Sequence, residues 1–323
     1  MVKVLVIGAP PLTLSRHCAN AFKQEGHETK YINYRFLYCH KFKITNKLLS
    51  KYLISVCSHF KPDLVFVVKG DSLLPGTVES MKKMGAYTMN WVIDEPTGKY
   101  YPVKITNLHE YDHAISFDKA YLSVIKQLGA PKADFLPIGA DETLFKEIIP
   151  LQKRNYICDA SFIGTFWPER EKLFLKIADK ELKIYGPHWK KKLAKDSLLQ
   201  GKIQKKVLNG TKMCKYFNLS KINLNQTHQQ AIDGGINLRI PEVLATRSFL
   251  LTNNLKGLDE LFTPDKELVV YKDTADFVKK VEYYLIHPAE RDAIAEAGYQ
   301  RLLKEHTLRH RVRTILKLAG LVH

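Results

Sequence analysis

The sequence lacks a hydrophobic run long enough to cross a membrane. No stretch approaches the ~18 uncharged apolar residues that a spanning helix needs, although hydrophobic residues make up 45% of the 323. The opening MVKVLVIGAP leads directly into an apolar strand, without the basic head, apolar core and cleavage site of a signal peptide. We therefore expect a cytoplasmic protein, with peripheral contact at the inner membrane surface as an open alternative.

Cysteine is scarce, and the patterns typical of metal sites are missing. Five cysteines are scattered without a CxxC pair or a paired Cys/His spacing. Such a set fits reduced thiols better than a disulfide framework or a zinc site. No Asp-x-Asp triplet occurs either. We expect no metal and no bound cofactor.

Acidic residues are too few to balance the basic ones. The chain has 50 Lys and Arg against 33 Asp and Glu, a net charge of +17, and lysines crowd between Lys180 and Lys215. One interpretation is a solvated lysine-rich face. The others are contact with an anionic membrane, an anionic acceptor polymer or nucleic acid. Nucleic acid ranks last because no recognition motif or interleaved aromatic platform accompanies the charge.

Short β-branched runs alternate with helical segments through the first half of the chain. Strands that read as unbroken apolar runs are buried on both faces, and helices between them imply parallel crossovers. This pattern predicts a doubly wound α/β domain over residues 1–147. Its strands are expected at residues 2–7, 29–33, 63–68, 87–92, 113–117 and 134–136, with helices at 14–24 and 76–84.

The same pattern restarts after a polar connector. It predicts a second Rossmann-like domain over residues 148–305 and a C-terminal helix, 306–323, that packs back on the first domain. Two such domains leave a cleft between them, where ligands usually bind. The second set of strands is expected at residues 157–163, 182–185, 222–224, 249–251 and 268–271, with helices at 169–178, 240–245 and 275–285.

Glycines end the first strand of each domain. Gly8 opens a loop, GAPPLTLSR, whose Pro10 and Pro11 remove the amide donors of a GxGxxG fingerprint, so a hydride-transfer enzyme is disfavoured. In the second domain, a glycine and the start of the next helix can approach a diphosphate. The residues expected there are Gly164, Thr165, Arg170, Tyr185 and Gly186.

The most informative stretch runs from Asn225 to Glu242. A glycine pair lies in a loop and is followed by a short helix on which Arg239 and Glu242, three residues apart, share one face. A carboxylate there can bind a ribose diol, and Arg239 with the loop amides can bind a diphosphate. The alternative is a surface Arg–Glu pair. The other residues expected at this donor site are Gly234, Gly235 and Asn237.

Several segments in order resemble the CgeB-type glycosyltransferases. They are DFLPIGADETLF, DASFIGTFWPER, LKIYGPHW, GINLRIPEVLAT with LLTN, and GLDELF, and the similarity covers about residues 110–320. The resemblance implies a GT-B fold, a nucleoside-diphosphate sugar donor (UDP favoured) in the second domain, and no catalytic metal. Glu242 matches the second acid of the E-x7-E pattern of related transferases. Gly234 stands at the position of the first acid of that pattern. This departure from the pattern argues against a simple retaining mechanism.

The first domain is then expected to present the acceptor. An inverting transferase needs a general base, and Asp94 in NWVIDEP is the first candidate, with Asp71 in VVKGD the second. Lys69 supplies positive charge at the same edge. Trp91 either stacks on a sugar or packs in the core, and His228 lies in the loop before the glycines. The acceptor is open: an anionic glycan, a polymer, a protein or a lipid-linked molecule.

Two other functional classes fit the same fold. A non-enzymatic two-lobed nucleotide- or sugar-binding protein shares the cleft but usually carries an export signal. A sugar-nucleotide epimerase or a phosphorylase is the second alternative. Product analysis would separate these enzymes from a transferase, because the epimerase needs no acceptor and the phosphorylase needs phosphate. A hexosyl-transferring enzyme remains the preferred interpretation, and its oligomeric state is open.

Overall fold

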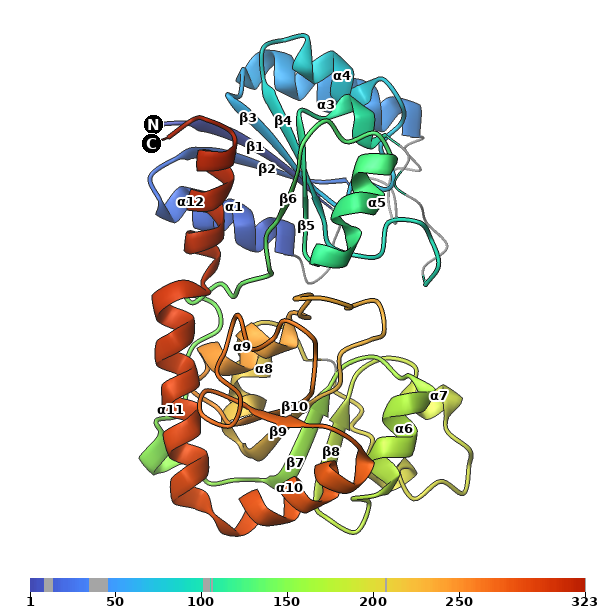
Figure 1. Cartoon of the computed structure of the whole chain (residues 1–323), viewed down its shortest axis with the longest axis vertical. Helices are drawn as coiled ribbons and strands as arrows, with labels where there is room; N and C mark the ends of the chain where they lie inside the picture. The colour runs from blue at the N-terminus through green and yellow to red at the C-terminus, as the bar shows by residue number, and fades with distance from the viewer. Residues whose placement is uncertain (9–13, 35–45, 101–104, 106, 207, 323) are drawn as a thin grey trace. The chain divides into compact units, whose positions relative to one another are not determined.

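The computed structural model describes residues 1–8, 14–34, 46–100, 105, 107–206 and 208–322 (Figure 1). They form two compact units. The first unit comprises Met1–Ile138, Gln230–Gly235 and Leu308–His323, and the second comprises Gly139–Gln229 and Ile236–Thr307. The chain therefore returns twice to the first unit after leaving it.

The first unit is built on a parallel sheet in the order β2-β1-β3-β4-β5-β6. Every residue of β3 is buried, as expected for a strand covered on both faces. The strands are β1 Lys3–Gly8, β2 Glu28–Asn33, β3 Leu64–Val68, β4 Tyr87–Val92, β5 His113–Ser116 and β6 Ala133–Phe135. The helices are α1 Leu14–Gln24, α3 Asn46–Phe60, α4 Thr77–Lys82, α5 Leu122–Gln127 and α12 Leu308–Leu318, with 3₁₀ turns at Leu108–Glu110 and Lys119–Tyr121.

The second unit repeats this architecture with a parallel sheet in the order β11-β10-β9-β7-β8. Its strands are β7 Cys158–Ile163, β8 Leu182–Tyr185, β9 Ser220–Asn225, β10 Leu250–Asn253 and β11 Val269–Tyr271. Its helices are α6 Pro168–Leu175, α7 Trp189–Lys192, α8 Thr211–Asn218, α9 Arg239–Ala245, α10 Thr274–Ile286 and α11 Pro288–Glu305, with 3₁₀ turns at Leu151–Lys153 and Gln200–Lys202.

The C-terminal helix α12 packs against α1 in the first unit (Figure 1). Arg309 Nε donates to Glu25 Oε1 over 2.5 Å, and Arg313 Nη2 donates to the same oxygen over 3.0 Å. Arg311 Nε donates to the carbonyl of Pro137 over 2.6 Å. Burial alone would raise the pKa of Glu25, but the two arginines outweigh it and lower the pKa. The C-terminal helix therefore belongs to the first unit.

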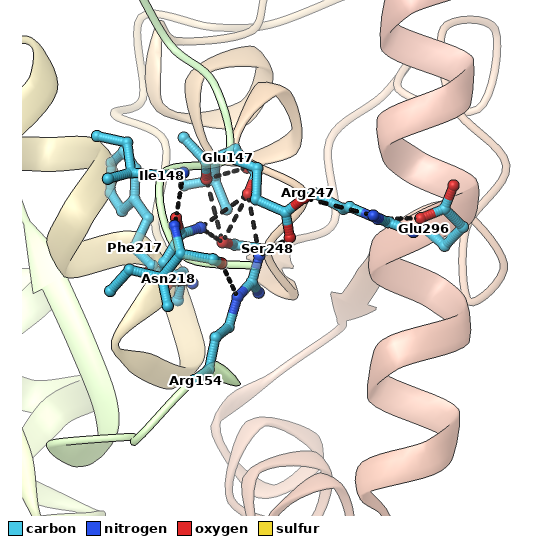
Figure 2. Close-up of polar contacts among 12 residues, drawn as sticks. Glu147, Ile148, Arg154, Phe217, Asn218, Arg247, Ser248 and Glu296 are labelled. Carbon is cyan, nitrogen blue, oxygen red and sulfur yellow. Dashed lines mark hydrogen bonds and ion pairs between the residues drawn. The ribbon is translucent and has the colours of Figure 1, made fainter. Parts of the chain in front are cut away.

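The connector between the two units is fixed inside the second unit by Asn218 (Figure 2). Asn218 is fully buried, and its Oδ1 accepts from the amides of Ile148 and Ile149 over 2.9 and 3.0 Å. Its Nδ2 donates to Thr246 O over 2.8 Å and to Ser248 Oγ over 2.9 Å. One amide side chain therefore joins the connector to the loop before β10.

A chain of ion pairs extends this network (Figure 2). Arg154 Nη2 lies 2.9 Å from Glu147 Oε1, and Arg247 Nη1 lies 3.3 Å from Glu147 Oε2. Arg247 also pairs with Glu296 on α11. The network links the connector to the longest helix of the second unit.

The predicted fold class is confirmed, because both halves are parallel α/β sheets with interleaved helices. The predicted domain boundary at 147/148 lies after the boundary of the units at Ile138, and the return of Gln230–Gly235 to the first unit was not predicted. Five helices of the described chain were also not predicted: α3, α5, α7, α8 and α11.

Candidate functional site

A charged cluster lies at the carboxyl edge of the first sheet, where β3 and β4 end side by side. Lys69 Nζ lies 3.0 Å from Asp94 Oδ2 and 3.7 Å from Asp71 Oδ2. Lys69 and Gly70 both have positive φ, 72° and 76°, which turn the chain sharply after β3. This turn brings together three residues that the sequence analysis selected separately.

The two candidate bases of this cluster differ in exposure. The side chain of Asp71 is only 2% exposed, and its Oδ1 accepts from Tyr34 Oη over 2.8 Å. The side chain of Asp94 is 24% exposed. A general base must reach the proton that it removes. Asp94 is therefore the more accessible of the two carboxylates.

The segment Gln230–Gly235, which we call the strap, is held in the first unit by Asp118. The carboxylate of Asp118 is fully buried and accepts from the amides of Ile232 (2.5 Å), Asp233 (3.1 Å) and Ala120 (2.8 Å). Burial raises the pKa of Asp118, and these amide hydrogen bonds oppose the rise. The amides of Ile232 and Asp233, directly before the glycine pair, therefore donate to a carboxylate of the protein itself.

The strap places Gln230 next to the acidic loop that follows β4. Gln230 Nε2 donates to Asp94 Oδ1 over 3.4 Å, and Gln230 Oε1 accepts from the amide of Glu95 over 3.3 Å. Tyr121 Oη donates to Gln230 O over 2.6 Å. Sequence reasoning missed Gln230, Asp118 and Glu95, because the strap is more than a hundred residues from its partners in the chain.

Glu95 shapes the loop that carries Asp94. Its side chain is buried, and its carboxylate accepts from the amides of Thr97 (2.6 Å) and Lys99 (2.7 Å). Burial alone would raise the pKa of Glu95, but these hydrogen bonds lower it below the ordinary value. Glu95 therefore stays ionised and fixes the loop, which leaves Asp94 as the more exposed acid.

Replacing Gly235 by alanine is expected to dislodge the strap. A Cβ at Gly235 would lie 2.3 Å from Asp118 Oδ2, far inside contact distance. We expect Gly235→Ala to lower the free energy of unfolding by about 1–3 kcal/mol, measured by urea unfolding. Gly201→Ala is the matched control, because a Cβ there meets nothing within 4 Å. Equal unfolding midpoints for the two variants would show that displacing the strap does not lower the free energy of unfolding.

Gly164 and Gly186 allow the chain segments that follow β7 and β8 in the second unit to pack closely together. A Cβ at Gly186 would lie 2.1 Å from Gly164 O, and that carbonyl accepts from Trp189 Nε1 over 2.8 Å. Tyr185 is buried and packs its ring 4.9 Å from that of Tyr216. The ring of Tyr185 is therefore part of the core of the second unit.

Arg170 lies at the same carboxyl edge but is held by carbonyl groups. Its Nη1 donates to Thr165 O over 2.7 Å, and its Nη2 donates to Gln226 O over 2.6 Å. Its guanidinium lies 5.0 Å from the ring centre of Phe162. Arg170 therefore ties the loop after β7 to the loop after β9, and its charge lies at the edge where a donor diphosphate was expected.

His228 lies close to this arginine. Its ring centre is 4.3 Å from that of Trp167. Burial, with the charge of Arg170 as a smaller cause, lowers its pKa, so the ring is neutral near pH 7.

Glu242 and Arg239 form a largely buried ion pair at the start of α9. Arg239 Nη1 lies 2.8 Å from Glu242 Oε2, and their side chains are 16% and 8% exposed. The alternative interpretation of a surface pair is therefore wrong. Burial raises the pKa of Glu242 to about 7, and Arg239 opposes the rise. Among the described residues, Arg239 Nε is buried without a hydrogen-bond partner.

Asn225 and Asn237 connect the loops around this helix. Asn237 Nδ2 donates to Asn225 Oδ1 over 2.9 Å, and Asn225 Nδ2 donates to Thr252 Oγ1 over 2.9 Å. Asn225 is buried. The pair therefore fixes the ends of β9 and β10 relative to the start of α9.

Two expected residues of the first unit have structural roles. Trp91 is fully buried and donates from Nε1 to Leu136 O over 3.3 Å, so it is a core residue and cannot stack on a sugar. A Cβ at Gly8 would lie 2.2 Å from Ser15 Cβ, which explains the glycine by the packing of α1 against β1. Residues 9–13 of the expected ligand loop lie outside the described residues.

A pocket of about 390 Å³ opens in the second unit, beside the ends of β9 and β11. Sequence reasoning did not single out the residues that line it. They are polar for the most part: Glu169, Lys172, Leu173, Gln226, Asn253, Asn254, Tyr271, Lys272, Asp273 and Thr274.

The described residues contain neither a metal-binding cluster nor a candidate membrane span. No group of three or more His, Cys, Asp or Glu in the described part of the chain is arranged to hold a metal ion. Among the same residues, no helix has the length and apolar character needed to cross a membrane.

Comparison with known proteins shows what this chain resembles. Residues 169–317 match the family described as glycosyl transferase-like. Spore protein CgeB of Bacillus subtilis (strain 168) is 21% identical over 262 residues, covering 77% of this chain and 80% of CgeB. The chain is therefore similar in sequence to glycosyltransferase-like proteins and to CgeB. The resemblance expected from the sequence motifs is confirmed.

The likeness to solved structures extends over the whole length of the chain. A glycosyltransferase from Rickettsia africae ESF-5 superposes with a TM-score of 0.67 at 14% identity, covering 98% of this chain and 97% of that one. Anabaena Alr3699/HepE, solved in complex with UDP-glucose, superposes with a TM-score of 0.66 at 10% identity over 100% of both chains. The fold is GT-B.

Proposed function

We propose that this protein transfers a hexosyl group from a nucleoside-diphosphate sugar, with UDP favoured, to an acceptor hydroxyl. The observation that carries the proposal is the likeness along the whole chain to HepE, a protein solved with UDP-glucose. The glycosyl transferase-like match over residues 169–317 supports the same function. The two parallel sheets supply carboxyl edges where ligands of such folds bind.

The donor is proposed to bind the second unit through Glu242 and Arg239. An ionised Glu242 can accept hydrogen bonds from the two ribose hydroxyls. Arg239 keeps a buried Nε–H without a partner among the described residues, and this donor is available to the diphosphate. Arg170 adds positive charge at the carboxyl edge of the same sheet. These positive groups can stabilise the leaving diphosphate without a metal.

Asp94 is proposed as the general base in the first unit. In an inverting transfer, Asp94 takes the proton of the acceptor hydroxyl while the hydroxyl oxygen of the acceptor attacks the anomeric carbon. The bond from that carbon to the diphosphate oxygen breaks, and the nucleoside diphosphate leaves with the electron pair. Lys69 Nζ lies 3.0 Å from Asp94 Oδ2 and places a positive charge beside the proposed base. Gly234, at the position of the missing first acid, favours inversion.

The role of Glu242 is tested by the pH dependence of nucleotide affinity. With a pKa of about 7, the ionised fraction of Glu242 rises as pH rises. The carboxylate accepts hydrogen bonds from both ribose hydroxyls only when ionised, so affinity for UDP is expected to increase about tenfold between pH 6 and pH 8. Isothermal titration at five pH values measures this.

Two variants provide the controls for this titration. Glu242→Gln keeps the size of the side chain and should bind UDP weakly with no pH dependence. Glu282→Gln, at a side chain 58% exposed, should behave as the wild type does. A Glu242→Gln variant that keeps both the affinity and the pH profile would remove Glu242 from the donor site.

A further inference from the structure

Residues 190–206, which we call the lysine segment, concentrate the positive charge of the protein. The segment contains seven lysines and one aspartate, a net charge of +6 out of the +17 of the whole chain. It follows β8, an edge strand of the second sheet. Such a concentration of one sign produces a strong local potential.

The lysine segment is a fixed surface, because buried apolar side chains anchor it. Trp189 is fully buried directly before it, and Leu193 and Leu199 are buried within it. Ile203 forms a parallel bridge with Ile184 of β8, and the amide of Gln204 donates to Ile184 O over 2.8 Å. The lysines between these anchors are therefore presented on an ordered scaffold.

Most of these lysines have no acidic partner. Within the described part of the chain, no carboxylate forms an ion pair with Lys190, Lys191, Lys192, Lys195 or Lys205, and all five are exposed. Lys202 and Lys206 instead contact Lys180 O and Tyr216 Oη. The charge of the segment is thus available to an external anion.

One apolar side chain distinguishes between the anionic partners. Leu198 is 71% exposed in the middle of the lysine segment, three residues after Lys195. A soluble polyanion offers no apolar contact to such a side chain. A lipid surface offers both the anionic headgroups and the acyl boundary.

We propose that the lysine segment docks the protein on an anionic lipid surface, with Leu198 inserted at the headgroup–acyl boundary. The exposed lysines bind the headgroups, and each contributes about a fivefold gain in affinity near a charged bilayer. Docking on lipid is a property of the second unit alone. The test of lipid docking is independent of the test of the proposed sugar transfer.

The test is co-sedimentation with vesicles of phosphatidylcholine containing 30% phosphatidylglycerol, against vesicles of phosphatidylcholine alone (about 0.1 M salt for both). The wild type should bind only the anionic vesicles, and more weakly as salt is raised. Lys190→Gln/Lys191→Gln/Lys192→Gln should bind about 100-fold more weakly. Leu198→Ser should bind about tenfold more weakly.

A charge-matched variant controls for net charge. Lys51→Gln/Lys126→Gln/Lys279→Gln removes three exposed lysines elsewhere and should bind vesicles as the wild type does. All variants should keep the wild-type melting temperature and the same UDP affinity. The proposal is overturned if the wild type does not bind, if the two triple variants lose binding equally, or if Leu198→Ser binds unchanged, since charge alone would then explain the contact.

Discussion

Asp94→Ala is expected to lower the rate of sugar transfer by about a thousandfold and to leave nucleotide affinity unchanged. A general base contributes about 10²–10⁴ to such a rate. Asp94 is the more exposed of the two acids beside Lys69, and it lies in the first unit, whereas the proposed donor residues lie in the second. The rate is measured as UDP release from UDP-glucose with an acceptor chosen from a sugar panel on the wild type.

Two further variants separate the base from its surroundings. Asp94→Asn keeps the size of the side chain and should be as slow as Asp94→Ala, while UDP affinity stays at the wild-type value. Asp71→Asn should lose much less activity, because Asp71 is buried and bound to Tyr34. If Asp71→Asn were slow and Asp94→Asn fast, the base would be Asp71.

Asn218→Ala is expected to lower the free energy of unfolding of the second unit by about 3–4 kcal/mol. The four hydrogen bonds of Asn218 in Figure 2 are all made to buried or half-buried groups. Alanine removes these bonds and leaves the two amides and the carbonyl of Thr246 without this partner. Urea unfolding followed by tryptophan fluorescence measures the change, since Trp167 and Trp189 both belong to the second unit.

Asn209→Ala is the matched control for this measurement. Asn209 is exposed and precedes α8, so its loss should change the free energy of unfolding by less than about 0.5 kcal/mol. Similar midpoints for Asn218→Ala and Asn209→Ala would mean that the connector is not held by Asn218.

Much of the fold could be predicted because the buried strands are continuous apolar runs. Residues 87–92 and 182–185 were predicted as strands with the bounds that the structure gives them. Helix α3 was missed although Leu49, Leu53 and Val56 recur at helical spacing on its buried side. Pro288 at the first turn of α11 is another signal that was present in the sequence and not used.

Residues of the candidate site could be predicted from the sequence only where they directly follow a predicted strand. Asp94, Asp71 and Lys69 follow strands, and the carboxyl ends of neighbouring parallel strands meet at one edge. The carboxylate of Asp118 accepts a hydrogen bond from the amide of Ile232, 114 residues away in the sequence. No local sequence pattern indicates such a contact. Trp91 shows the same limit, since only the packed core decides between the two roles considered for it.

The central claim is that this protein binds a nucleoside-diphosphate sugar as a transferase donor. Its most direct test is a thermal-shift panel of UDP, GDP, ADP, CDP and dTDP with their sugars, in buffer containing EDTA. A ligand at about 100 times its Kd stabilises the folded state by about 2.7 kcal/mol. We predict a rise in melting temperature with UDP and UDP-glucose, lost in Glu242→Gln at pH 8. No shift with any nucleotide would contradict the proposed function.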